Sequence, residues 1–310
     1  MHSVVATDCS TKTELGVEDM QKQYVGIDLG GTKIIVACAD EKGNIIKKVK
    51  NDTPLGLDDG IAMIKNMVKE VSSSPASIGC ACGGPLDWRS GIVSPLHQPK
   101  WRAVPLRQIM EKEFGCRFYV DVDTNVAALG EYFFGSAAAH KNFIYITLST
   151  GMGAGKLQDG KICRGKGHPE MAHQSFALSL KNAQASFVHD NYLCECGAKH
   201  CLETYVSGNA IRRIYGKPAE QITDDNVIRE IAQNFGEGLR NIAALYSPEA
   251  IIIGGGVAYG WGERLLAPAR EVVSQNLKIV PVPKIKLASL GYNSALMGSI
   301  ALAIHGEDVL

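Results

Sequence analysis

The sequence predicts an α/β protein of two lobes, and three observations lead to this prediction. Strand-like segments at 24–28 and 143–148 each run into a glycine-rich bend and a returning strand, which is the pattern of a β-hairpin. Strands alternate with helical segments after the first hairpin, as they do in βαβ units. The chain has 310 residues, close to the length at which one core divides into domains of roughly 150 residues.

The first half of the chain supplies the elements of one lobe. The pattern predicts strands at 24–28, 34–40 and 45–49, a helix that Asp58 can cap and that ends near 72–75, strands at 77–82 and 118–122, and a helix over 126–132. Hairpins followed by βαβ units are typical of α/β proteins.

The second half repeats the opening pattern. The elements expected there are a strand at 143–148 with its bend at 149–155, a long amphipathic helix over 227–246 that stops at Pro248, a strand at 250–253, and a helix of small residues over 294–305. The repeated hairpin therefore predicts a duplicated lobe.

Composition and charge exclude several classes of protein. Hydrophobic residues make up 45% and charged residues 21%, as in ordinary globular proteins. Lys and Arg number 32, and so do Asp and Glu, so nucleic acid is not expected as a partner. Segment 1–23 lacks the apolar run of a signal peptide or membrane anchor and is expected to be a short extension. Nine cysteines without an export signal favour reduced thiols and a cytoplasmic location.

Three glycine-rich bends each follow a strand directly, at Gly30-Gly31, at 149–155 and at 254–256. Without a Cβ atom, backbone N–H groups can come close to an anion such as phosphate. A single glycine pair is more often only a turn. Because no G-x-x-x-x-G-K-[ST] segment is present and no G-x-G-x-x-G opens a helix, the bends predict phosphate binding outside the P-loop and Rossmann folds.

Six motifs, in the same order along the chain, resemble those of the ROK sugar kinases. They are Asp28-Leu29-Gly30-Gly31-Thr32-Lys33, Asp123-Thr124-Asn125-Val126-Ala127-Ala128, 149–155, Glu170-Met171-Ala172-His173, the run from Cys194 to Glu203, and Gly254-Gly255-Gly256-Val257. The resemblance implies an actin-like, hexokinase-like ATPase fold in which two ribonuclease-H-like lobes flank a cleft. We expect one lobe to comprise 24–130 and 295–310, and the other to comprise 131–294 with the zinc motif.

The resemblance implies roles for two aspartates. Asp123 would be the general base that takes the proton from the sugar hydroxyl, although a residue at a strand-to-helix junction can also be a simple helix N-cap. Asp28 would organise Mg²⁺ and its waters, since hard carboxylate oxygens suit that ion.

The resemblance also implies the residues that bind ATP and the sugar. Those expected to contact phosphate are Gly30, Gly31, Thr32, Lys33, Thr150, Gly151 and Gly153, while Gly254, Gly255 and Gly256 would pack on the adenosine end. Those expected to bind the sugar are Gly84, Asp123, Glu170, His173 and Glu203. Val122 replaces the usual Asn before the general base, and His97 also departs from the family pattern, so an unusual sugar is expected.

Three clustered cysteines predict a structural zinc site. Cys194, Cys196 and Cys201 lie within eight residues, and a histidine would complete a Cys₃His set. By resemblance that histidine is His173, with His189 and His200 as local alternatives, and an unmetallated thiol cluster is the other possibility. Segment 174–193 is expected to be an insertion near the site.

The expected function is ATP-dependent phosphorylation of a hexose, with glucose as the default, or of an N-acylated hexosamine. The direct transfer needs no enzyme nucleophile. A sugar-sensing protein without catalysis is the alternative, because ROK relatives include repressors, but the stretch before Tyr24 is too short for their helix-turn-helix module. An actin-like ATPase scaffold would not need Glu170, His173 or the cysteines. The resemblance further suggests a homodimer.

Overall fold

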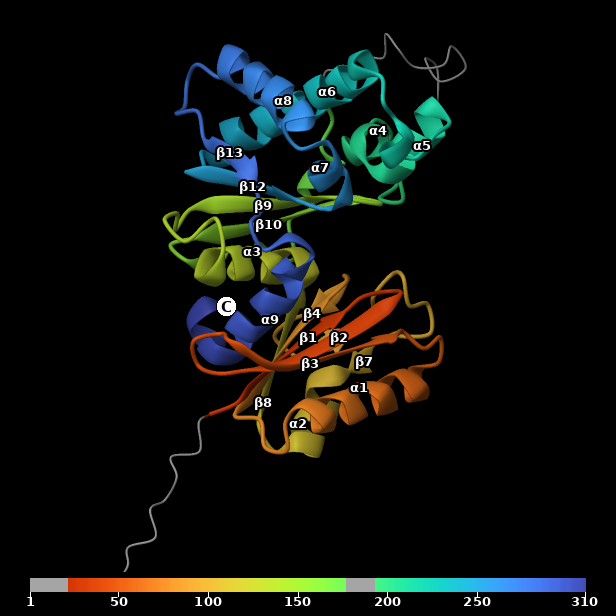
Figure 1. Ribbon diagram of the computed structural model, residues 1–310, viewed down its shortest axis with the longest axis vertical. Coiled ribbons are helices and arrows are strands. Elements are labelled where there is room, and N and C mark those ends of the chain that lie inside the picture. The colour runs from red at the N-terminus through yellow and green to blue at the C-terminus, as the bar shows by residue number, and fades with distance from the viewer. Residues whose placement is uncertain (1–21, 177–192) are drawn as a thin grey trace, which may run out of the picture.

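The computed structural model describes residues 22–176 and 193–310 and arranges them in stacked layers (Figure 1). Two sheets lie apart from each other, and two helices fill the space between them. Further helices cover the outer face of each sheet. This order of layers lets the central strands of both sheets be buried on their two faces.

The N-terminal sheet has five strands. Their spatial order is β3 (Ile45–Asp52), β2 (Lys33–Ala39), β1 (Tyr24–Leu29), β4 (Ser77–Cys82) and β8 (Arg117–Val122). The first three are antiparallel, whereas β1, β4 and β8 run parallel. Helices α1 (Leu57–Val71) and α2 (Leu106–Phe114) cover the outer face. A small three-stranded sheet, β5 (Leu86–Asp87), β6 (Ile92–Val93) and β7 (Val104–Pro105), lies between β4 and α2 in the chain.

The C-terminal sheet repeats this arrangement. Its order is β11 (Lys161–Ile162), β10 (Met152–Gln158), β9 (Phe143–Leu148), β12 (Ala250–Gly254) and β13 (Lys284–Leu287), again three antiparallel strands followed by parallel ones. Its outer face is covered chiefly by α6 (Asp225–Tyr246) and α8 (Glu263–Asn276). Shorter helices near its end are α4 (Glu203–Val206), α5 (Gly208–Tyr215) and α7 (Gly256–Trp261). The duplication predicted from the two hairpins is therefore present.

Helices α3 (Asp123–Phe134) and α9 (Ser294–His305) form the layer between the sheets. Helix α9 packs on β1 and β4, α3 packs on β9 and β10, and the two helices contact each other. Their small residues allow this close approach: a Cβ on Gly298 would lie 1.7 Å from the carbonyl oxygen of Val126. The fold thus joins its two halves through a tight helix pair.

Most elements begin and end near the predicted residues, with informative exceptions. Helix α1 begins at Leu57 after Gly56, and Asp58 lies in its first turn, where its charge favours the helix dipole, so the predicted Asp58 cap is wrong. Helix α3 begins at Asp123 rather than at 126. The lobe boundaries at 130 and 295 stay a prediction, because α3 and α9 each pack in the layer that the two sheets share. Within the described part of the chain, no helix is long and apolar enough to span a bilayer.

Candidate active site

Parallel strands bring two aspartates to one edge of the N-terminal sheet. The register places Leu29, Cys82 and Val122 side by side at the ends of β1, β4 and β8. Asp28 comes directly before this row and Asp123 directly after it. Functional side chains gather at the carboxyl ends of parallel strands for this topological reason.

The Asp123 side chain is exposed to solvent at the start of α3, and its backbone neighbour Thr124 donates an N–H to Asp123 Oδ1 at 2.7 Å. Nearby protein displaces part of its hydration and so raises its pKa, an effect that the charge of Glu170 reinforces. His168 and His97 act in the opposite direction. An accessible carboxylate with a raised pKa suits general-base chemistry.

Asp28 is partly buried, and its pKa is raised to about 7. Burial is the main cause, the negative charge of Asp123 adds to it, and Lys48 opposes it. Two neighbouring carboxylates that repel each other form a place where a divalent cation would be stabilising.

The bend between β1 and β2 is held by its own backbone and by neighbouring segments. Gly30 donates its N–H to the Lys33 carbonyl at 3.0 Å, and its carbonyl accepts from the Thr53 hydroxyl at 2.8 Å. His97 packs against Gly31, while Lys33 forms an ion pair with Asp52. Thr32 is exposed at the tip of the bend.

The second bend adjoins α4, the helix that begins at Glu203. Glu203 Oε1 accepts the Met152 N–H at 3.0 Å and lies beside Gly151. Thr150 accepts the Asn209 N–H at 3.0 Å, and Gly153 packs against the methyl group of Thr124. The bend therefore connects the start of α3, which carries Asp123, to α4 and α5.

A cavity of about 790 Å³ opens beside this second bend. Its lining includes Thr150, Asn209, Arg212, Gly256 and Tyr292. Of the three glycines at 254–256, only Gly256 lines it: Gly254 is buried in β12 near the Tyr145 hydroxyl. Gly255 has φ +96°, and a Cβ there would lie 2.3 Å from the Leu148 carbonyl oxygen, so this turn requires glycine. A cavity of this size can hold a nucleotide.

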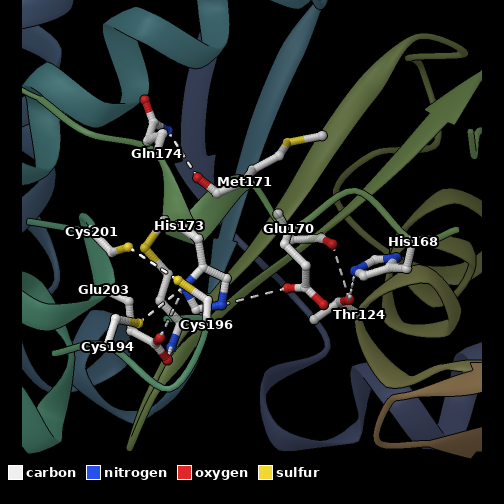
Figure 2. A network of polar contacts seen from close by, with 12 residues as sticks. Thr124, His168, Glu170, Met171, His173, Gln174, Cys194, Cys196, Cys201 and Glu203 are labelled. Carbon is white, nitrogen blue, oxygen red and sulfur yellow. Dashed lines mark hydrogen bonds and ion pairs between the residues drawn. The ribbon is translucent and has the colours of Figure 1, made fainter. Parts of the chain in front are cut away.

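Glu170, His173 and Glu203 lie together, as Figure 2 shows. His173 Nε2 is 3.9 Å from Glu170 Oε2, and His173 Nδ1 is 3.6 Å from Glu203 Oε2. The negative charge of Glu170 in turn raises the pKa of Asp123. Three of the residues expected to bind a sugar, Glu170, His173 and Glu203, thus form one connected group.

The three cysteines meet His173 in one cluster. The ligand atoms of His173, Cys194, Cys196 and Cys201 all lie within 4.8 Å of one another. Cys194 Sγ is 3.3 Å from His173 Nδ1, and the sulfurs of Cys196 and Cys201 are 3.5 Å apart. Zinc–sulfur bonds of about 2.3 Å place tetrahedral ligands about 3.8 Å apart, so the donor set fits a zinc ion.

Of the two alternative fourth ligands, only His200 lies within the described residues. His200 Nδ1 instead pairs with the Tyr205 hydroxyl at 2.8 Å, and its ring stacks on Tyr205. His189 and most of the predicted insertion at 174–193 lie outside the described residues.

The remaining sequence predictions concern the segment after β4 and the residue before the base. Gly84 follows β4, and nothing lies within 4 Å of where its Cβ would be. Val122 is buried at the end of β8.

The sequence motifs did not mark His168 near Asp123, Lys48 near Asp28, or Tyr292 at the cavity. None belongs to a motif, and each comes from an element distant in sequence, so no local signal marked them.

The chain is similar to known proteins over most of its length. The profile of the ROK family matches residues 24–305. A fructokinase of Zymomonas mobilis is 32% identical over 309 residues, covering 93% of this chain and 98% of that protein. A xylose repressor of Caldicellulosiruptor bescii is 28% identical over 319 residues, covering 90% and 77%. The solved structure of a ROK family glucokinase from Streptomyces griseus, in complex with glucose and AMPPNP, has a TM-score of 0.74 at 30% identity and covers 92% of this chain and 100% of that one.

Proposed function

This chain belongs to the ROK family, as its motifs predicted, and we propose that it is an ATP-dependent sugar kinase in which Asp123 is the general base. The fold expected from the sequence is confirmed by the same comparisons. The observation that carries the proposal is the position of Asp123, exposed at the start of α3 and at the same edge of the sheet as Asp28. The negative charge of Glu170 also acts on Asp123. The similarity to a fructokinase and to a glucokinase bound to glucose and AMPPNP supports a sugar as acceptor.

Asp123 accepts the proton of the sugar hydroxyl as that hydroxyl attacks the terminal phosphorus of ATP, and the bond from that phosphorus to the bridging oxygen breaks to release ADP. A positioned base contributes roughly 10²- to 10⁴-fold to the rate. Glu170, His173 and Glu203 orient the sugar through its other hydroxyls. We expect a hexose or an N-acylated hexosamine, with glucose as the first substrate to try.

The nucleotide would occupy the cavity lined by Thr150, Gly256 and Tyr292. Gly30 and Gly31 would contact its phosphates. Asp28 would hold Mg²⁺, which neutralises phosphate charge when bound. Lys48 adds positive charge near Asp28, which lowers the pKa of that carboxyl group. Positioning and charge neutralisation supply most of the catalysis of phosphoryl transfer.

A structural zinc held by His173 and the three cysteines would fix the His173 ring. Because His173 Nδ1 faces the sulfurs and Nε2 faces Glu170, the ring can serve the metal and the sugar at once. We expect about one equivalent of zinc in the purified protein, and less than half an equivalent in Cys201→Ser, with a weakened sugar affinity. Cys163→Ser, half-buried and outside the cluster, is the control. Folded wild-type protein without zinc would contradict this assignment.

Replacement of Asp123 by Asn tests the kinase proposal. Asn keeps the size of the side chain but cannot take the proton, so kcat should fall about 10²- to 10⁴-fold while both KM values change only a few-fold. The measurement is ADP release with a panel of hexoses and hexosamines, and Asp308→Asn, an exposed site, is the control. Undiminished turnover in Asp123→Asn would exclude this residue as the base.

A second candidate is a sugar-binding protein without turnover, which the similarity to a xylose repressor favours. The same panel of hexoses and hexosamines distinguishes the sugar-binding protein from the kinase. Sugar binding detected by calorimetry, with no ADP formed from ATP and Mg²⁺, would support the sensor and reject the kinase.

A further inference from the structure

A buried ion pair includes the residue two positions before the proposed base in the chain, and the proposed mechanism does not use it. Arg164 pairs with Asp121, and the two side chains are 8% and 1% exposed. Asp121 also accepts the Asn125 amide at 2.8 Å and the Val122 N–H at 2.7 Å. Removing charges from water is costly, so a pair this buried persists only with several partners.

The pair connects segments that are distant in sequence. Asp121 lies on β8 two residues before Asp123, in the same row of the sheet as Ala81 and Asp28. Arg164 lies just after β11 of the other sheet. Its guanidinium also sits 4.1 Å from the centroid of the Trp88 ring, between β5 and β6. Arg164 is therefore a contact between elements of both halves of the molecule.

Arg164 also begins the segment 164–173, which carries the sugar-binding residues Glu170 and His173. A second contact holds the same segment to α3: His168 Nε2 lies 3.4 Å from the Thr124 hydroxyl. Since that hydroxyl donates to the Ala154 carbonyl at 3.0 Å, the imidazole N–H is the donor to it. The segment is thus attached on both sides of Asp123, at Asp121 and at Thr124.

We propose that Arg164 is a positioning residue, which holds the sugar-binding segment 164–173 at a fixed place relative to Asp123 without touching the substrate. This inference rests on the proposed kinase function. Arginine suits the role because its planar, permanently charged group can pair with a carboxylate and stack on an aromatic ring together. Lysine can keep the charge but cannot reproduce the planar stack.

The nucleotide cavity is built from other elements, and this gives the proposal a distinctive consequence. Thr150, Gly256 and Tyr292 lie outside the 164–173 segment, and neither Arg164 nor Asp121 lines the cavity. Displacement of the segment should therefore weaken sugar use far more than nucleotide use. A general loss of structure would affect both.

The experiment compares Arg164→Met, Arg164→Lys and the control Arg270→Met in steady-state kinetics. Arg270 on α8 also pairs with a carboxylate, that of Glu263, and neither residue lines the nucleotide cavity. We expect Arg164→Met to raise the sugar KM about ten-fold or more and to lower kcat, with the nucleotide KM within about two-fold of wild type. Arg164→Lys should show a smaller rise in the sugar KM and a smaller fall in kcat than Arg164→Met. Arg270→Met should change neither the sugar KM nor the nucleotide KM.

Two further variants keep the proposal open to disproof if Arg164→Met does not fold. Trp88→Leu removes the stack and leaves the ion pair, and it should raise the sugar KM selectively by a smaller factor. In Asp121→Asn combined with Arg164→Met, the effects on kcat/KM should not add, because the two residues act as one unit. An unchanged sugar KM in folded Arg164→Met or Trp88→Leu, or equal rises in both KM values, would overturn the proposal. Absence of wild-type turnover on every sugar would instead reject the kinase function itself.

Discussion

Two carboxylates of like charge stand close together at the end of β1 and β8, and this affects stability as well as catalysis. Asp28 has a pKa of about 7 in the folded protein, whereas an unfolded aspartate titrates near 3.9. The folded state therefore binds the proton more tightly, and ionised Asp28 destabilises it. That destabilisation is complete above pH 7 and decreases as the pH falls toward the unfolded value.

Asp28→Asn should therefore stabilise the protein at pH 8 while it removes kinase activity. We expect a gain of about 1–2 kcal/mol in the free energy of unfolding at pH 8, since the group is partly exposed, and a clearly smaller gain at pH 5. Urea denaturation in buffer without Mg²⁺ measures both values, with Asp308→Asn as the control. A gain that is the same at both pH values would show that the charge of Asp28 is not the cause.

The helix pair α3 and α9 depends on glycines that let two backbones touch. A Cβ on Gly298 would collide with the Val126 carbonyl, whereas nothing lies within 4 Å of a Cβ on Gly260 in α7. We expect Gly298→Ala to destabilise the protein by about 2–3 kcal/mol, and Gly260→Ala to be neutral or slightly stabilising. Chemical denaturation measures both, and a neutral Gly298→Ala would mean that the helices can separate without cost.

Sequence patterns located some elements to the residue and left others out, for physical reasons. Strands β4 and β9 and helix α9 have the predicted bounds, because runs of apolar and small residues mark them clearly in the sequence. Helix α8 was not among the predicted elements, and Pro268 in its interior is a residue that normally ends a helix. The short α2 and the small sheet β5–β7 have too few residues for a period to show.

The candidate site was predictable only in part. The motifs marked Asp28, Asp123, Glu170 and His173, but their convergence came from the family resemblance, since they lie on elements far apart in the chain. Burial, charge and pairing partners come from tertiary structure. The pKa of Asp28 and the pairing of Arg164 with Asp121 therefore had no signal in the sequence.

At the scale of the whole molecule, one apolar cluster takes residues from both sheets and from the helices between them. It includes Ala81 of β4, Phe143 and Tyr145 of β9, Leu129 of α3 and Leu302 of α9. Strand β9 shows the division: Phe143 and Tyr145 face this shared cluster, while Ile144 and Ile146 face the core under α6 and α8. Unfolding either half would expose apolar surface of the other.

This shared core predicts that the two halves unfold as one unit, although chains of this length often unfold in steps. Calorimetry should give a single transition whose calorimetric and van't Hoff enthalpies agree. Ile64→Ala in α1 and Leu265→Ala in α8 each remove a buried side chain from one half only, at a cost of about 2–5 kcal/mol. Both substitutions should lower the midpoint temperature of the same single transition. Two resolved transitions, with each variant moving a different one, would show that the α3–α9 layer does not couple the halves.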